Sequence, residues 1–213
     1  MRSIKQLRPR TLARVGAGLG VTALAGTLTM SLGLTGASAT STARAQAHPQ
    51  ASYSFDLVPS PNIASCLPDA SGKVTITPGK LNDIMKVSIS GMPAHAGFDL
   101  FVIQQPLAPF GVSWYQTDVN ANAYGDGSAT VEGVFDVETF SVSPGGTTTF
   151  SPTHQYHLGL WFSNPQTPFK LGCEPGATTA TVTPFNGEQH AGVQALNTSE
   201  FPADAGPLSQ VKR

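Results

Sequence analysis

The chain has 213 residues, of which 40% are hydrophobic and 12% are charged, and its formal net charge is −1. Six of the twelve basic residues lie within residues 1–47, whereas all thirteen acidic residues come later, so residues 48–213 carry a formal charge of −7. This later part lacks the basic patch that binding to nucleic acid or to an anionic membrane surface requires.

Residues 1–47 have the pattern of an export signal. The basic segment MRSIKQLRPRTLAR precedes the uncharged stretch VGAGLGVTALAGTLTMSLGLTG, and small-residue A-x-A sites follow at 37–39, 43–45 and 45–47. The uncharged stretch is long enough to span a bilayer, so an uncleaved anchor is the alternative. Its many Gly and Thr residues and the A-x-A sites favour cleavage. We therefore expect a bacterial signal peptide and leader over 1–47, and a secreted or envelope-associated domain over 48–213 without membrane insertion.

Strand patterns fill most of the remaining chain, and turn residues separate them every eight to twelve positions. The predicted strands are 73–77, 83–92, 98–105, 112–118, 128–135, 137–142, 156–163, 180–183 and 191–197. Residues 48–52 and the tail from about residue 203 are expected to be loose. Many short strands at this spacing predict a single all-β domain, an antiparallel immunoglobulin-like or fibronectin-like β-sandwich. A jelly roll is the alternative.

The two cysteines, Cys66 and Cys173, both lie after the leader, in the turn-like settings SCLPD and GCEPG. In an exported chain two cysteines are expected to form one disulfide, and two buried thiols are the alternative. Without a third cysteine, a Cys-rich zinc site is excluded.

Three segments carry a resemblance that covers most of residues 48–213. PFGVSWYQTD, HLGLWFSNP and TPFNGEQHAGVQALNTSEFPADAGPL resemble segments of a group of uncharacterised secreted bacterial proteins. The resemblance implies export and a single β domain, and it implies no catalytic residue.

Two motifs raise the question of a metal site. Asp118 and Asn120 stand where a calcium-binding loop begins, but Ala123 and Ala129 replace the glycine and the bidentate glutamate that such a loop needs. A polar turn is the simpler interpretation, with a calcium site of other geometry at Asp118, Asn120 and Asp126 as the alternative. The pair His154 and His157 opens a predicted strand, where residues three apart point to opposite faces and do not share a metal.

Acid–base chemistry has two weak candidate pairs. Asp136 and Glu138 share a face of a strand-like stretch, as glycosidase carboxylates do, but an exposed edge strand has the same pattern. Glu188 and His190 follow the Asn186-Gly187 pair, the strongest short signal for a β-hairpin. We expect a hairpin there rather than an acid–base or metal pair.

Trp114, Tyr115 and Trp161 are the candidate contact aromatics, because such side chains stack on sugar rings and anchor protein interfaces. Trp114 and Tyr115 are neighbours in one strand, so at least one points away from the core unless both faces of the sheet are covered, which is the slightly favoured interpretation.

The sequence as a whole favours a non-catalytic binding module that meets a protein or glycan at or outside the cell envelope. A small secreted hydrolase acting on glycans and a structural envelope protein are the alternatives. Catalytic motifs such as G-x-S-x-G and H-E-x-x-H do not occur in the chain.

Overall fold

The computed structural model describes residues 50–135, 141–142, 148–149, 154–183 and 190–212, all within one unit that spans residues 46–213. Its strands are β1 (Tyr53–Pro59), β2 (Ser71–Thr77), β3 (Asp83–Ser90), β4 (Gly97–Ile103), β5 (Ser113–Asn120), β6 (Gly127–Gly133), β7 (Ser141–Val142), β8 (Thr148–Thr149), β9 (His157–Phe162) and β10 (Gln194–Asn197). The helices are α1 (Pro61–Cys66), α2 (Gln166–Lys170) and the 3-10 helix η1 (Pro207–Gln210).

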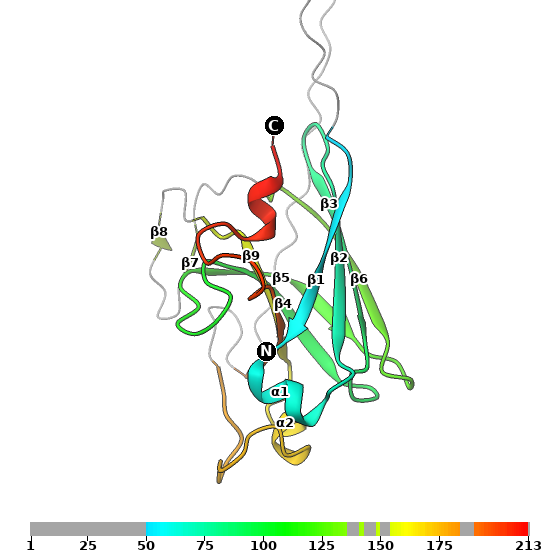
Figure 1. Cartoon of the computed structure of the whole chain (residues 1–213), viewed down its shortest axis with the longest axis vertical. Helices are drawn as coiled ribbons and strands as arrows, with labels where there is room; N and C mark the ends of the chain where they lie inside the picture. The colour runs from blue at the N-terminus through cyan, green and yellow to red at the C-terminus, as the bar shows by residue number, and fades with distance from the viewer. Residues whose placement is uncertain (1–49, 136–140, 143–147, 150–153, 184–189, 213) are drawn as a thin grey trace, which may run out of the picture. The chain divides into compact units, whose positions relative to one another are not determined.

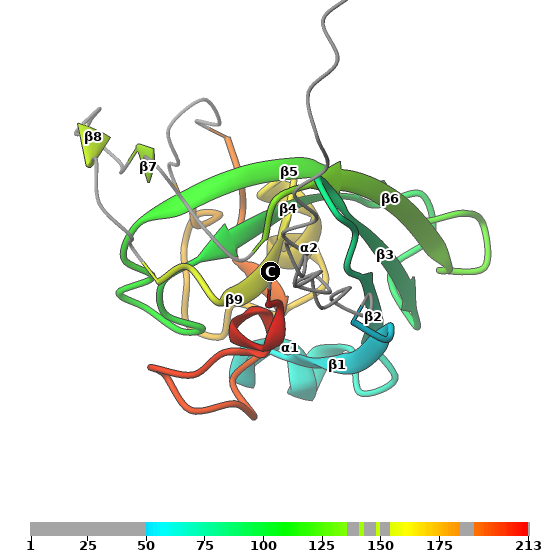
Figure 2. The same cartoon turned by 90° about the horizontal axis from the view of Figure 1, so that it is seen from above.

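The described strands form one antiparallel sheet in the order β6-β3-β2-β1-β10-β9-β4-β5-β7-β8. This confirms the all-β, antiparallel class, with a single continuous sheet in place of two separate ones. β1 makes the sheet continuous because Tyr53–Leu57 pairs with β2 while Val58 and Pro59 pair with β10. The sheet curls, so that β1, β2, β3 and β6 face β4, β5 and β9 across the core (Figures 1 and 2).

Strands β2, β3 and β6 form at positions that the sequence predicts, and β2 and β3 alternate between buried and more exposed residues. Val74 and Ile76 of β2 pack against Met85 and Val87 of β3 in the core, while the residues between them point to solvent. A strand repeats every two residues, so an apolar–polar alternation buries one face and exposes the other.

Strands β4 and β9 are buried on both faces. Their inner residues, such as Leu100 and Leu160, lie in the main core, whereas Phe101 and Trp161 on the outer face form a second apolar cluster with Ala191. Chain segments outside the strands cover that outer face, as the hydrogen bond from Gln194 Nε2 to the carbonyl of Pro106 (3.0 Å) shows.

The disulfide prediction is confirmed: Cys66 and Cys173 are bonded, with their Cα atoms 5.2 Å apart. Cys66 is the last residue of α1 and Cys173 follows α2, and these two short helices lie next to each other in Figure 1. The bond therefore ties the segment after β1 to the segment after β9.

The C-terminal segment is not loose, contrary to the prediction from about residue 203. Pro207 and Leu208 of η1 and Val211 are buried, and Tyr53 Oη donates to the carbonyl of Pro207 at 3.1 Å. Burial and the nearby carboxylate of Asp83 raise the pKa of this tyrosine, which keeps its hydroxyl a donor. The sequence did not predict this packing, because the apolar residues of this Pro- and Gly-containing segment follow neither a helical nor a strand period.

One predicted strand needs correction. Residues 180–183 do not form a strand, although Thr183 N–H donates to the carbonyl of Ala191 at 2.7 Å, as expected where the chain reverses. β10 pairs instead with β9 and β1. The turn itself, with Asn186, Gly187 and Glu188, lies outside the described residues.

Within the described part, no helix is both long and apolar enough to span a membrane.

Candidate functional site

Strand β5 carries the two exposed contact aromatics, and an irregularity in its pairing sets their directions. Leu100 of β4 pairs with Thr117, but the next residue, Phe101, pairs with Tyr115, so Gln116 is an extra residue in β5. Such a bulge re-aims the side chains beside it. Tyr115 therefore lies on the outer face beside Phe101, and Trp114 lies opposite Val102 on the other face.

Both aromatics are partly open to solvent: 41% of Trp114 and 44% of Tyr115 is exposed. The favoured interpretation, that both faces of this strand are covered, is therefore wrong. The physical reason is the position of β5 near the end of the sheet. One edge of β5 pairs with β4, and on the other edge Ser113 is the one described residue that pairs, with Val142 of β7.

Tyr115 is the exposed end of a row of aromatic rings on the outer face. Phe110, Trp161, Phe101 and Tyr115 follow one another in edge-to-face contacts, with centroid separations of 4.9, 5.6 and 5.6 Å. Edge-to-face pairs are favourable because the positive ring edge meets the negative ring face. The row holds the Tyr115 ring in one place.

Trp161 does not have the contact role that the sequence suggested, because its side chain is fully buried. Its indole lies over Gly159, where a Cβ atom would collide with the ring. Trp161 instead supports Phe101, which in turn supports Tyr115.

Two aspartates accompany the aromatic row on the outer face. Tyr115 Oη donates to Asp118 Oδ1 at 2.7 Å, and Asp118 lies directly opposite Asp99 of β4. Asp99 is buried, and its Oδ1 accepts a hydrogen bond of 2.7 Å from Ser163 Oγ. Sequence reasoning missed Asp99, although a lone acid inside the apolar run FDLFVI was a usable signal, because a buried carboxylate needs a polar partner.

The 121–126 turn follows β5 and contains part of the suggested calcium ligand set. The side chain of Asn122 closes it, since Oδ1 accepts the N–H groups of Tyr124 (2.7 Å) and Asp126 (3.1 Å). This is the geometry of a polar β-turn. Within the described residues no three His, Cys, Asp or Glu side chains gather so that they could hold a metal ion.

The acid–base candidates are untested. Asp136, Glu138 and Glu188 lie outside the described residues. His190 lies within the described residues, and its side chain is exposed.

His154 and His157 do not form a common site. His154 is exposed and precedes β9, with Nδ1 3.1 Å from Tyr156 Oη. His157 is buried, and both of its ring nitrogens are engaged: Nδ1 with Thr198 Oγ1 (2.9 Å) and Nε2 with the carbonyl of Pro202 (3.1 Å). Burial lowers the pKa of His157, although these hydrogen bonds act in the other direction. His157 fastens the segment after β10 to β9.

No protein-family model matches the chain, and no curated protein matches it.

Proposed function

We propose that this protein is a secreted, non-catalytic binding module that contacts a protein or glycan at or outside the cell envelope through β5, with Tyr115 on the outer face of this strand and Trp114 on its other face. The observation that supports the proposal best is the state of Tyr115, which is 44% exposed although Phe101 and Asp118 fix its ring and its hydroxyl. A fixed aromatic side chain loses little conformational entropy on binding, which is why tyrosine and tryptophan dominate binding energy at interfaces.

The neighbouring carboxylate indicates what kind of partner fits. Asp118 is exposed beside Tyr115, and strands β4, β5 and β9 contain no Lys or Arg. An ionised carboxylate only accepts hydrogen bonds, so the surface favours a partner with donor groups, such as sugar hydroxyls or the N–H groups of a protein. A polyanion would be repelled, in keeping with the charge of −7 after the leader.

Export and the immunoglobulin-like architecture belong to the same proposal. The Cys66–Cys173 disulfide supports an oxidising compartment, since such bonds rarely persist in the cytosol. The two facing halves of the sheet support a sandwich-like domain. The disulfide departs from the immunoglobulin pattern because it joins segments beside two helices rather than two facing strands.

One observation favours the hydrolase alternative. Asp99 and Asp118 are directly opposed on neighbouring strands, where Cβ atoms lie about 5 Å apart, close to the carboxylate spacing of retaining glycosidases. However, Ser163 and Tyr115 already donate hydrogen bonds to these carboxylates. The binding module is therefore preferred.

Co-sedimentation with bacterial sacculi, chitin, cellulose and whole bacterial cells tests the proposal. We expect the protein to bind at least one of these materials, and a variant with both Trp114→Ala and Tyr115→Ala to bind it at least tenfold more weakly. Tyr124→Ala is the matched control, because Tyr124 is an aromatic residue that is 89% exposed in the next turn.

Equal loss of binding in the Tyr124→Ala control, or full binding by the double variant, would contradict the assignment of the contact surface. A panel without any bound material would count against a glycan partner and against a target on the cell surface.

A further inference from the structure

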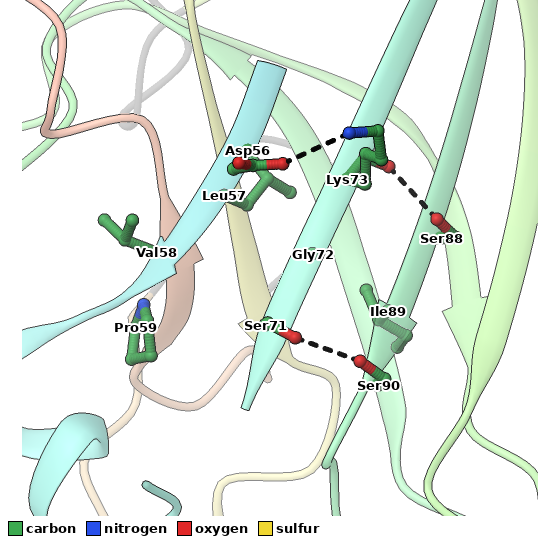
Figure 3. Close-up of a pocket in the computed structure, with 10 residues that line it drawn as sticks. All are labelled: Asp56, Leu57, Val58, Pro59, Ser71, Gly72, Lys73, Ser88, Ile89 and Ser90. Atoms are coloured by element: carbon green, nitrogen blue, oxygen red, sulfur yellow. Dashed lines mark hydrogen bonds and ion pairs between the residues drawn. The ribbon is translucent and has the colours of Figure 1, made fainter. Parts of the chain in front are cut away.

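Strands β1 and β2 stop pairing with each other near the end of β1 and the beginning of β2, and a pocket lies where they separate. Their pairing ends at Leu57 and Gly72, after which Val58 and Pro59 pair with β10 while Ser71 stays paired with Ser90 of β3. Figure 3 shows β1 turning away from β2 at this point. The pocket has a volume of about 440 Å³, within the range of small-ligand sites.

One side of this pocket is lined by hydroxyl groups. Ser71 and Ser90 point toward each other across neighbouring strands, with their Oγ atoms 2.9 Å apart, and Ser88 Oγ donates weakly to the carbonyl of Lys73 (3.4 Å). Each serine hydroxyl has one donor and two acceptor positions. The contact between Ser71 and Ser90 uses one donor and one acceptor, which leaves further positions for a ligand.

The remaining walls are an ion pair and an apolar surface. Lys73 Nζ lies 3.8 Å from Asp56 Oδ1, and both side chains are mostly exposed, at 62% and 71%. The apolar lining that a ligand can reach comes from the half-buried Val58 and Pro59, since the side chains of Leu57 and Ile89 lie in the main core. The charged groups therefore balance, and the pocket offers hydrogen-bonding groups beside aliphatic surface.

This combination selects a class of ligand. A phosphate or carboxylate ligand needs an excess of cationic donors, and a metal ion needs several anionic oxygens, but here one lysine faces one aspartate. A neutral sugar ring has the complementary surface, since its hydroxyl groups donate and accept while its C–H groups pack on aliphatic side chains. The lining contains no aromatic residue, so recognition rests on the hydroxyl groups.

We propose that the pocket between β1 and β2 binds a neutral sugar residue of a glycan. This site is separate from the surface on β5 and does not depend on the function proposed for it.

Saturation-transfer NMR and isothermal titration of the full-length protein test the proposal with defined probes. The probes are cellohexaose, maltohexaose and mannohexaose as neutral glycans, and hexagalacturonate as an anionic one. We expect at least one neutral hexasaccharide to bind, and hexagalacturonate to bind at least tenfold more weakly than that sugar.

The critical variant carries both Ser71→Val and Ser90→Val, which removes two hydroxyl groups and fills the pocket with residues that suit a strand. We expect its affinity for the neutral hexasaccharide to fall at least tenfold. Ser128→Val is the matched control, since Ser128 is exposed opposite Ser88 on β6 but does not line the pocket; it should stay within twofold of the wild type. Lys73→Gln, which removes the cation and leaves the serines, should also weaken binding.

No binding by any neutral hexasaccharide, equal binding by the double variant, or tighter binding of hexagalacturonate would overturn the proposal. If binding is instead lost with Trp114→Ala and Tyr115→Ala but kept in the serine variant, the β5 surface holds the glycan and the pocket inference fails alone.

Discussion

The two halves of the sheet have the same antiparallel pairing but very different outer faces. On β1, β2, β3 and β6 most outward side chains are small and hydroxylated or charged, as in the pairs Ser54–Thr75 and Ser71–Ser90, with Ile84 as an exposed apolar exception. On β9, β4 and β5 the outward side chains include Trp161, Phe101 and Tyr115, and loops cover all but the last of them. The first face is exposed along its whole length, whereas the second reaches solvent mainly at β5.

This difference shows how one sheet can separate stability from recognition. A covered outer face adds a second apolar cluster, and its last member, Tyr115, is held rigid because it packs on that cluster. The outward side chains of the open face contribute little packing, so they can be substituted at little cost in stability. Substitutions in the buried cluster should therefore lower stability, whereas substitutions on the open face should leave it nearly unchanged.

The largest expected effect on stability comes from Trp161→Ala. Removing a fully buried tryptophan leaves a cavity, and we expect the free energy of unfolding to fall by about 3–5 kcal/mol in urea denaturation. Thr130→Ala, on the exposed face of β6, should change it by less than about 1 kcal/mol. Equal costs for the two variants would mean that the faces do not differ as described.

The disulfide connects the two halves and should rank second. Replacing Cys66 and Cys173 with alanine opens a loop of 107 residues, which is expected to lower the free energy of unfolding by up to about 4 kcal/mol. Urea denaturation of the variant and of the reduced wild-type protein, each compared with the oxidised wild-type protein, measures this. A cost below about 0.5 kcal/mol in both would show that α1 and α2 stay together without the bond.

A smaller effect should follow from pH, through His157 beneath the C-terminal segment. Its pKa in the folded protein lies below the ordinary value of 6.5, so the unfolded chain binds more protons when the pH falls below that value. The stability that His157 contributes is therefore complete above about pH 7 and is lost as the pH falls through 6.5 toward the folded pKa.

Thermal unfolding between pH 5 and pH 8 measures this dependence. His157→Gln should flatten the melting-temperature profile near pH 6, whereas His154→Gln, a change at the exposed neighbouring histidine, should leave it intact. A profile that flattens only with His154→Gln would refute the role given to His157.

The sequence predicted the regular half of the fold well, and the reason is local. In β2 and β3 each residue's environment follows from its place in an alternating pattern, and Val74, Ile76, Met85 and Val87 all lie on the buried face. β1 was missed because YSFDLVP alternates only over its first residues and then changes partner at Val58. α1 and α2, with six and five residues, are too short for a helical period to appear.

The candidate site was less predictable because it depends on pairing between distant segments. The bulge at Gln116 interrupts the regular alternation of side chains along β5. Only the pairing of β5 with β4 reveals this bulge. The same register brings Asp99 and Asp118 together across 19 positions of sequence. Trp161 gave no sign of which side of the surface it would occupy, since the chain that buries it comes from elsewhere in the sequence.

Hydroxyl-radical footprinting of the full-length protein tests the central claim most directly. The oxidation rates of Trp114, Tyr115 and Tyr124 would be compared with and without the material that the protein binds in co-sedimentation. The account predicts that binding protects Trp114 and Tyr115 several-fold while Tyr124 reacts as before. Protection of Tyr124 with unchanged oxidation of Trp114 and Tyr115 would contradict it, because the partner would then bind outside the β5 surface.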